Sequence, residues 1–598
     1  MGGTPFAGRA CAHVAAAHGV LRFPVAVRRA GRVARFSRGR EIPEEIEMPD
    51  RLRARTVKKA VRPAGSLLLL LVFAALGASC ADGGAGPQAK SAPPEDASPR
   101  RGGELRLNFT GISTLDPALT SGLNEAAVTR QIFDGLVELD EELRIVPEAA
   151  LAWDTSEDRR TFRFRLRPGM RFHDGSPVEA ADFLYSFERL VDPRVNSPAA
   201  AFFSVVEGVD AHRAGRAEHV SGLRAPESLV FEITLNEPYQ PFLEILAMPW
   251  AKVVPRRAVE AGGFGSKPVG SGPFRFASRE PGAGILLAAN DSYVRGRPLL
   301  DRVVVTELEG NEVMEAFRQG RLDYLGASEA RFEEASRGTR YRVTRRPSLT
   351  LTFLGFRLSI PELKDVRIRR AISAAIDRSA IVAALEGQAA VARTVLPPGM
   401  PGYDPGAATD SFDRERAISL LAEAGHPDGD GLGEFRLLVG GVPNQTMICK
   451  LLRSQLARIG ISVRIEPVEN YERYLEALRE AELYVFGWGA DFPDPENFLG
   501  PLFRTAAVYN FGAYSCAEVD RLLDSARYLS DKVARLSLYR TAERRILADA
   551  PIVPLFHDSM VHYLQPDVRG LEVSALGIYQ ASLRSAWKAS PPAPEPAR

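Results

Sequence analysis

The chain has 598 residues, too many for a single hydrophobic core, so several domains are expected. Its composition, with 45% hydrophobic and 25% charged residues, is that of an ordinary globular protein. The net charge of +1 hides an asymmetry, because residues 1–62 carry 14 Lys/Arg and 5 Asp/Glu, whereas the chain from Cys80 onward carries 62 basic and 70 acidic residues. The body is therefore mildly acidic, which excludes the basic footprint that a nucleic-acid-binding protein needs.

The N-terminal region has the pattern of a secretory signal. The basic run RLRARTVKKAVR (51–62) precedes the apolar run LLLLLVFAAL (67–76), which is followed by small residues and Cys80. A basic region, an apolar region and a short cleavage region in this order are typical of a signal peptide. The cysteine at the cleavage point resembles a bacterial lipobox, with Gly77 where Leu is usual, so we expect Cys80 to be the lipidated first residue of the mature protein.

An uncleaved transmembrane anchor is the alternative for this region, because residues 64–81 are uncharged over a length near the minimum for spanning a bilayer. Under either interpretation the body lies outside the cytoplasm, on the periplasmic or cell-surface side, and is attached to a membrane. Translation could start at Met1 or at Met48, which would give a signal of normal length. We expect residues 1–79 to form the leader and residues 80–101, rich in Gly, Pro, Ser and Ala, to form a flexible tether.

The first predicted elements of the body lie in residues 160–175. Here Phe or Leu alternates with Arg up to a turn at Pro168–Gly169. Period-two alternation predicts a half-buried antiparallel hairpin with its arginines in solvent. The next stretch predicts a helix, because four apolar residues share one stripe: Phe183, Phe187, Leu190 and Val191.

Further along the chain, residues 365–387 carry apolar side chains at the spacing of one helix face and predict a core-facing helix that ends at its final glycine. Another helix is expected to end at Gly460. It is followed by a strand (461–468), a helix (471–480) and a strand (482–488), an order that implies a right-handed parallel crossover. The body is therefore predicted to be mixed α/β.

Six blocks of the sequence resemble, in order and spacing, the family 5 extracellular solute-binding proteins, the oligopeptide- and dipeptide-binding components of ABC importers. The blocks are LDPALTSGLNEAAVTRQIFDGLVELD (115–140), FRFRLRPGMRFHDGSPVEAADFLYSFERLVDP (162–193), KPVGSGPFRF (267–276), NDSYVRGRPLLDRVVV (290–305), LGFRLSIPELKDVRIRRAISAAIDRSAI (354–381) and VFGWGADFPDPENFLGPLF (485–503). The similarity covers roughly residues 102–588, nearly the whole expected mature chain.

The resemblance implies an α/β, two-lobed periplasmic-binding-protein fold of type II, of the larger kind whose first lobe carries an extra subdomain. It implies a first lobe at 102–305, a second lobe at 306–552 and a return segment at 553–588 that crosses the hinge a second time, which leaves 589–598 as a disordered tail. Such a protein would be a monomer without a cofactor. It would hold a short peptide between its lobes and deliver it to an ABC permease with ATPase subunits in the inner membrane.

The main candidate site lies in the last of these blocks. In α/β sheets, ligands bind beyond the carboxyl ends of parallel strands, and Asp491 comes just after the strand predicted over 482–488. In peptide-binding relatives, the aspartate of a W-x-x-D pattern pairs with the α-ammonium group of the peptide, and Trp488 and Asp491 fit that spacing. We therefore predict that Asp491 binds the ligand, although an aspartate here could also order only its own loop.

Three other residues belong to the expected site. Trp488 is expected either in the core or as a wall that packs on the ligand. Glu125 matches a family position that faces the peptide, but it would also suit a helix as a first-turn acid favoured by the helix dipole. Arg357, where relatives usually have Asn, could bind a ligand carboxylate or could lie on the surface after a strand. By contrast, Asp494 before Pro495 is predicted to cap a helix.

Other chemistries find little support in the sequence. GSGPF (270–274) lacks the GK[ST] ending of a phosphate loop, and His557 and His562 fall on opposite faces of a predicted strand, so neither nucleotide nor metal binding is expected. No nucleophile motif indicates an enzyme. Cys449 and Cys516 could pair in an oxidising compartment. The alternatives to a peptide carrier are the same fold with a nickel chelate, haem, oligosaccharide or opine-like ligand, and a sensing surface lipoprotein without transport.

Overall fold

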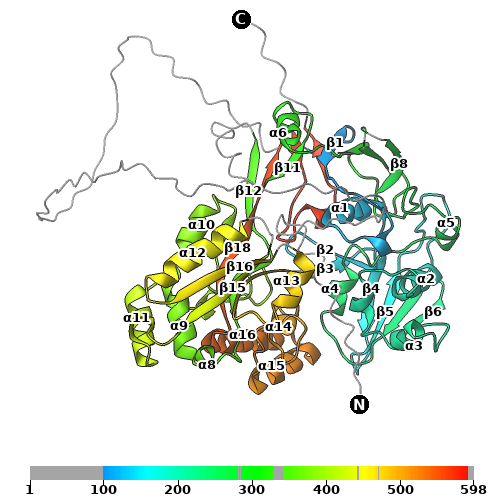
Figure 1. Ribbon diagram of the computed structural model, residues 1–598. Coiled ribbons are helices and arrows are strands. Elements are labelled where there is room, and N and C mark those ends of the chain that lie inside the picture. The colour runs from blue at the N-terminus through cyan, green and yellow to red at the C-terminus, as the bar shows by residue number, and fades with distance from the viewer. Residues whose placement is uncertain are drawn as a thin grey trace, which may run out of the picture. The chain divides into compact units, whose positions relative to one another are not determined.

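The computed structural model of the chain (Figure 1) describes residues 98–280, 282, 284–327, 341–440, 444–468 and 470–589. The predicted signal segment, the lipidation site Cys80, the start at Met48 and the tail from residue 590 lie outside the described residues. Within the described ranges, no helix is both long enough and apolar enough to cross a membrane.

The first sheet has the strand order β1-β10-β9-β8. Its strands are β1 (Glu104–Asn108), β10 (Arg302–Thr306), β9 (Gly284–Ala289) and β8 (Phe274–Glu280). β1 runs parallel to β10, and the other pairs are antiparallel. Helix α1 (Leu123–Ile132) follows the short helix η2 (Pro117–Leu119) and lies against β8.

The glycines of GSGPF (270–274) allow this segment to pack closely against the end of α1. The Gly272 N–H donates to the Ile132 carbonyl at the end of α1 at 2.8 Å, and a Cβ on Gly270 would lie 2.0 Å from the same oxygen. The glycine-rich run therefore lets two backbones approach closely, as glycine does wherever a side chain would clash.

The second sheet is antiparallel, with the order β4-β5-β7-β6. Its strands are β4 (Ala150–Thr155), β5 (Thr161–Leu166), β7 (Val230–Thr234) and β6 (Leu223–Glu227). In β5 buried and exposed residues alternate, and Arg163 meets Glu232 at 2.6 Å on the exposed side, so the predicted strand and its solvated arginines are confirmed. The predicted hairpin is wrong, because β5 pairs with β4 and β7 rather than with the residues after Gly169.

Short elements surround this second sheet. The predicted helix with Phe183 and Phe187 is confirmed as α2, and both rings are buried beside Phe231 of β7. The elements and their bounds are α2 (Ala180–Val191), η3 (Ala200–Phe203), α3 (Val209–Arg213), α4 (Phe242–Leu246), α5 (Arg256–Glu260), and the hairpin of β2 (Val137–Leu139) and β3 (Ile145–Pro147).

The third and largest sheet follows the path β11-β18-β13-β17-β15-β16, with β12 and β14 also paired to β18. Its strands are β11 (Tyr324–Ala327), β12 (Arg342–Pro347), β13 (Thr350–Phe356), β14 (Ala389–Val391), β15 (Glu434–Gly440), β16 (Ser462–Val468), β17 (Leu483–Gly489) and β18 (Ile552–Leu564). β16 and β17 both run parallel to β15, which lies between them. The predicted strand, helix and strand are confirmed, with α13 (Tyr471–Ala477) as the connecting helix.

The central strands of this sheet are buried on both faces. Leu483 and Val485 of β17 join the apolar cluster under the helices of this sheet, whereas Tyr484, Phe486 and Trp488 join a second cluster that reaches the other two sheets. Besides α13, the described helices between β10 and β18 in the chain are α6 (Asn311–Arg318), α8 (Pro361–Lys364), α9 (Val366–Ala375), α10 (Arg378–Ala384), α11 (Arg414–Glu423), α12 (Gln445–Ala457), α14 (Glu496–Phe503), α15 (Ala517–Tyr528) and α16 (Lys532–Asp549), with the short helices η4 (Pro405–Ala407) and η5 (Pro427–Gly429).

The single helix predicted over 365–387 is wrong, since two helices occupy this range. α9 ends before Ile376, whose backbone is extended, and α10 begins after Asp377. The Asp377 carboxylate accepts hydrogen bonds from the N–H groups of Ser379 and Ala380, at 3.0 and 3.2 Å. Aspartate favours the first position before a helix, so it starts a new helix where the apolar spacing alone would continue the old one.

The last part of the chain connects the large sheet to the first one. β18 pairs with β13 through its early residues and with β11 and β12 through its late ones. Figure 1 shows β18 beside β11 and β12. After β18 come β19 (Val568–Arg569), η6 (Ile578–Gln580) and β20 (Trp587–Lys588). The Gln131 side chain of α1 bonds to Ala581 and Leu583, both at 3.0 Å, so this segment is fastened to α1.

Candidate ligand-binding cavity

A cavity lies where segments from distant parts of the sequence meet, with about 480 Å³ of empty space that includes open solvent at its mouth. The lining residues are Thr120, Ser121, Gly122, Leu123, Ala126, Pro198, Ala199, Phe202, Pro249, Trp250, Asp491 and Tyr579. They come from the start of α1, from η3, from the loop after α4, from the loop after β17 and from η6. Asp491 is the one lining residue with an acidic side chain.

Asp491 lies two residues beyond the carboxyl end of β17 and is only 1% exposed. Asn497 of α14 holds its loop, because the Asn497 amide oxygen accepts from the Asp491 N–H at 2.8 Å, and Nδ2 donates to Oδ2 at 3.3 Å. Burial raises the pKa of the Tyr579 hydroxyl on the same wall, and the Asp491 carboxylate adds to this effect. The structure therefore places Asp491 on the wall of a cavity, and its charge acts on a neighbouring lining residue.

Trp488 is a buried support of this loop rather than a lining residue of the cavity. It is 3% exposed, its ring packs on Tyr509 with centroids 4.9 Å apart, and its indole N–H donates to the Asn497 carbonyl at 2.8 Å. Trp488 and Asp491 therefore both contact Asn497, one from the strand and one from the loop.

Glu125 is the first-turn acid of α1 and closes the loop before that helix. Its carboxylate accepts from the Ser113 N–H and hydroxyl, at 2.9 and 2.5 Å, and from the N–H groups of Ser121 and Gly122, at 3.0 and 3.2 Å. The side chain is 3% exposed and is absent from the cavity lining, whereas Ser121 and Gly122 belong to it. In this structure Glu125 shapes the wall through its backbone partners.

Removing the Glu125 carboxylate is expected to loosen this wall. The variant Glu125→Ala leaves three backbone N–H groups without their acceptor, and we expect it to lower the free energy of unfolding by about 2–3 kcal/mol. Chemical denaturation measures the loss. Glu125→Gln keeps one acceptor oxygen and should lose less, and a Glu125→Ala protein as stable as the wild type would contradict this role.

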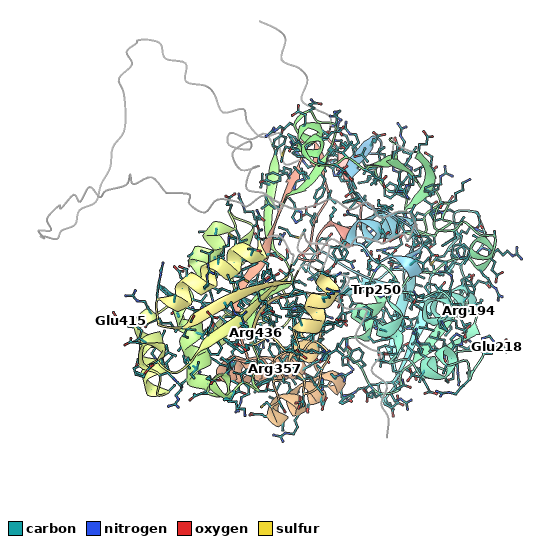
Figure 2. The ribbon with its side chains drawn as sticks, in the orientation of Figure 1. Arg194, Glu218, Trp250, Arg357, Glu415 and Arg436 are labelled. Atoms are coloured by element: carbon teal, nitrogen blue, oxygen red, sulfur yellow. The ribbon has the colours of Figure 1, made fainter. Side chains whose placement is uncertain are left out.

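Arg357 does not reach the cavity. It follows Phe356, which pairs with Leu483 at the start of β17, whereas Asp491 follows the far end of that strand. Six residues of β-strand separate the two ends, a distance of about 20 Å. The Arg357 guanidinium bonds to the Ser359 hydroxyl at 2.9 Å, and Figure 2 draws Arg357 well apart from Trp250 of the cavity wall.

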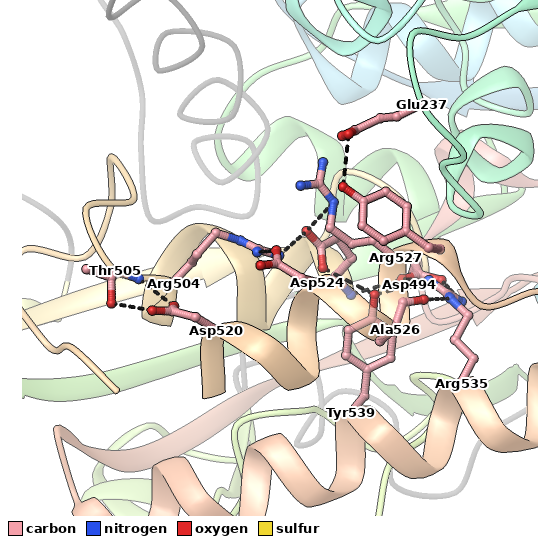
Figure 3. A network of polar contacts seen from close by, with 12 residues as sticks. Glu237, Asp494, Arg504, Thr505, Asp520, Asp524, Ala526, Arg527, Arg535 and Tyr539 are labelled. Atoms are coloured by element: carbon pink, nitrogen blue, oxygen red, sulfur yellow. Dashed lines mark hydrogen bonds and ion pairs between the residues drawn. The ribbon is translucent and has the colours of Figure 1, made fainter. Parts of the chain in front are cut away.

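Asp494 belongs to an ion-pair network behind the cavity loop (Figure 3). Its two carboxylate oxygens each accept from Arg535 of α16 at 2.7 Å, and both side chains are buried. Asp494 also accepts from the Glu496 N–H at 2.9 Å. Its predicted role as the helix cap next to Pro495 needs correction, because α14 begins at Glu496 and the cap position is Pro495 itself. The bidentate pair with Arg535 is its main interaction.

The network also ties residues 237–240 to α15. The Tyr528 hydroxyl donates to Glu237 at 2.9 Å, and the Gln240 N–H donates to the Arg527 carbonyl at 3.1 Å. The Arg527 guanidinium lies over the Tyr239 ring at 5.1 Å. These contacts join the segment before α4, which leads to Trp250, to the helices that follow the Asp491 loop.

The histidines of β18 take separate partners. His557 donates from Nδ1 to the Thr350 carbonyl at 2.7 Å, and His562 bonds to the Tyr324 hydroxyl at 2.9 Å. Among the described residues, no group of three or more His, Cys, Asp or Glu could hold a metal ion. Cys449 and Cys516 are both free thiols in this structure.

Burial lowers the pKa of His557 to about 4, from 6.5. Between these values the unfolded chain binds more protons than the folded one, so stability falls as the pH falls. Relative to His557→Gln, the wild type should lose up to about 3 kcal/mol of its unfolding free energy between pH 7 and pH 4. Urea denaturation at both pH values measures this loss, and a difference that does not change with pH would contradict it.

The sequence did not reveal three lining residues, Phe202, Trp250 and Tyr579. Each belongs to a segment far from Asp491 in the chain, and only the packing of η3, the loop after α4 and η6 brings them together. The single local signal was the aromatic pair FF in residues 202–203, and such a pair is equally typical of a buried core.

The fold is the two-lobed type II fold of periplasmic binding proteins, as expected from the sequence. The chain belongs to the bacterial extracellular solute-binding proteins of family 5, whose model for the middle region matches residues 144–510. The chain is 28% identical to heme-binding protein A of Haemophilus influenzae over 488 residues, which cover 77% of this chain and 88% of that protein.

Two further comparisons agree with this family assignment. A probable di/tripeptide-binding protein 5 of Pseudomonas aeruginosa is 28% identical over 478 residues, which cover 75% of this chain and 88% of the relative. The structure of the ABC transporter-associated periplasmic binding protein DppA from Helicobacter pylori, in complex with the peptide STSA, matches with a TM-score of 0.64 and 26% identity. That match covers 82% of this chain and 98% of the DppA chain. The family consists of binding proteins rather than enzymes.

Proposed function

We propose that this protein captures short peptides between its two lobes and delivers them to an ABC permease. The observation that carries the proposal is a buried carboxylate, Asp491, at the carboxyl end of β17 on the wall of a mostly apolar cavity. A peptide amine that enters this cavity would gain a charge-assisted hydrogen bond, worth roughly 1.5–3 kcal/mol. The relatives named for di- and tripeptides support the same ligand class.

The proposed lobes follow the sheets. The first lobe is residues 102–305, with the first and second sheets, and the second lobe is residues 306–552, with the third. The return segment is 553–588, although the first residues of β18 still pair with β13, so the crossing runs along β18. Asp323 before β11 bonds to Arg106 of β1 at 2.9 Å and to Lys588 of β20 at 2.7 Å, contacts that would tie the crossings together. Ligand contacts to both lobes would then favour closure.

A thermal-shift assay on the purified protein tests the ligand class. A ligand at a hundred times its dissociation constant stabilises the folded state by about 2.7 kcal/mol, so a tripeptide with a free amine should raise the melting temperature. The same tripeptide acetylated at its N-terminus should give a much smaller rise, because the amide nitrogen carries no charge for Asp491. Equal shifts would contradict the proposal.

Haem is the competing ligand, because the relative from Haemophilus influenzae is named for it. Haem iron in proteins is held by His, Cys, Met or Tyr, and the described lining offers only Tyr579 of these types. A haem titration followed by visible absorption separates the two ligands. A stoichiometric spectral change that a free-amine tripeptide does not reverse would favour haem.

We also propose that Cys80 is lipidated and that the body is held as a monomer on the outer side of a membrane. The signal pattern before Cys80 supports this anchor. A sensing lipoprotein would share the anchor and the cavity but would not feed a permease. Growth of an auxotroph on a peptide that supplies its amino acid, with and without the gene, distinguishes transport from sensing.

A further inference from the structure

The wall around Asp491 is apolar over most of its extent. Its apolar members include Leu123, Ala126, Ala199, Phe202, Pro249 and Trp250, and the described lining holds no Lys, Arg or His. Several polar groups of the wall are already used. The Thr120 hydroxyl donates to the Asp116 carbonyl at 3.2 Å, and the N–H groups of Ser121 and Gly122 donate to Glu125. A ligand group that reaches this wall therefore meets mostly carbon, apart from Asp491 and the polar ends of Ser121, Trp250 and Tyr579.

An aromatic cluster lies close to the carboxylate. The rings of Phe202 and Trp250 are parallel, with centroids 5.0 Å apart, and Phe492 packs edge-on against Phe202 with centroids 6.2 Å apart. Phe492 follows Asp491 directly in the chain, so the cluster begins one residue from the proposed amine site. Aromatic rings pack well on apolar and aromatic partners in such offset and edge-on arrangements.

The geometry of a peptide links the amine to the first side chain, because both are attached to the same carbon. If the amine binds Asp491, the first side chain must lie within the same cavity. An apolar side chain gains from leaving water there, whereas a charged side chain loses its hydration. A basic side chain would find only Asp491 in the described lining, and in this proposal the amine already binds Asp491. An acidic side chain would also meet the like charge of Asp491.

We infer that this cavity selects peptides whose first residue has an apolar side chain, aromatic side chains above all. The inference rests on the proposed function, since Asp491 must hold the amine. It adds a selectivity set by Phe202 and Trp250, with Phe492 packed against Phe202. Charged first residues are excluded by desolvation rather than by steric size.

Calorimetric titration of the full protein with five tripeptides tests this selectivity: Phe-Ala-Ala, Leu-Ala-Ala, Ala-Ala-Ala, Lys-Ala-Ala and Asp-Ala-Ala. We expect Phe-Ala-Ala to bind roughly tenfold or more tightly than Ala-Ala-Ala, and Asp-Ala-Ala to bind most weakly. Comparable affinities for all five, or a preference for the Lys or Asp peptide, would overturn the inference.

Variants separate this inference from the proposed function. Phe202→Ala, or the milder Phe202→Leu if the first does not fold, should bring the affinity ratio of Phe-Ala-Ala to Ala-Ala-Ala towards one. An unchanged ratio would show that Phe202 does not contribute to the selectivity. If the binding of every peptide is insensitive to Asp491→Asn, or if no peptide binds, the proposed function itself fails and the selectivity fails with it. If binding depends on Asp491 but not on the first side chain, only the selectivity fails.

Discussion

Replacing Asp491 by Asn is expected to weaken the binding of a free-amine tripeptide roughly 10- to 100-fold, because the ligand amine loses a charged partner in a buried site. Asn has nearly the same shape, and its amide oxygen can still accept from the Asn497 side chain, as Oδ2 of Asp491 does at 3.3 Å. The fold should therefore persist. Titration calorimetry of wild type and variant measures the change in affinity.

A matched control removes one negative charge elsewhere. Glu415 in α11 is exposed and lies outside the cavity lining, so Glu415→Gln changes the net charge equally without touching the site. We expect Glu415→Gln to bind the tripeptide as the wild type does. Equal weakening in both variants would mean that the overall charge, rather than Asp491, governs binding.

Replacing Arg535 by Met is expected to give the largest loss of stability, about 3–5 kcal/mol, because it leaves the buried Asp494 carboxylate without its partner. Two hydrogen bonds of 2.7 Å join these side chains, and a third joins Arg535 to the Ala526 carbonyl at 3.0 Å. Burial and the charge of Asp494 raise the pKa of Glu244 to about 7, and Arg535 opposes that rise. The variant would therefore leave both Asp494 and Glu244 without the positive charge of Arg535.

Two further proteins test this explanation by urea denaturation. Arg544→Met removes a cation from the same helix, α16, but the ion pair of Arg544 with Asp404 is exposed, so its loss should matter far less. The double variant Arg535→Met with Asp494→Leu removes both charges and should recover much of the lost stability. If Arg535→Met costs no more than Arg544→Met, the buried pair does not stabilise the fold as described.

Local patterns in the sequence predicted the elements whose partners are close by. The alternation in residues 161–166, the apolar stripe that contains Phe183, and the strand, helix and strand up to residue 489 all fold as predicted. Each depends on which face of one element is buried, a property that the spacing of apolar residues records directly. The fold class followed from the resemblance and is confirmed by the matched structures.

Predictions that depended on distant partners fared less well. The partner of β5 could not be deduced, because β7 lies more than sixty residues further along the chain. Asp494 was assigned to its neighbouring helix, since Arg535, its main partner, is 41 residues away. The position of Asp491 beyond a strand end could be predicted from its local sequence, whereas the aromatic wall from Phe202 and Trp250 exists only once the segments pack.

The central claim is that the Asp491 carboxylate binds the ligand's amine. A four-way titration tests it most directly, with wild type and Asp491→Asn each measured against a tripeptide and its acetylated form. The account predicts that acetylation weakens binding to the wild type roughly tenfold or more and has almost no effect on the variant, because the two changes remove the same interaction. An equal effect of acetylation on both proteins would show that the amine binds elsewhere.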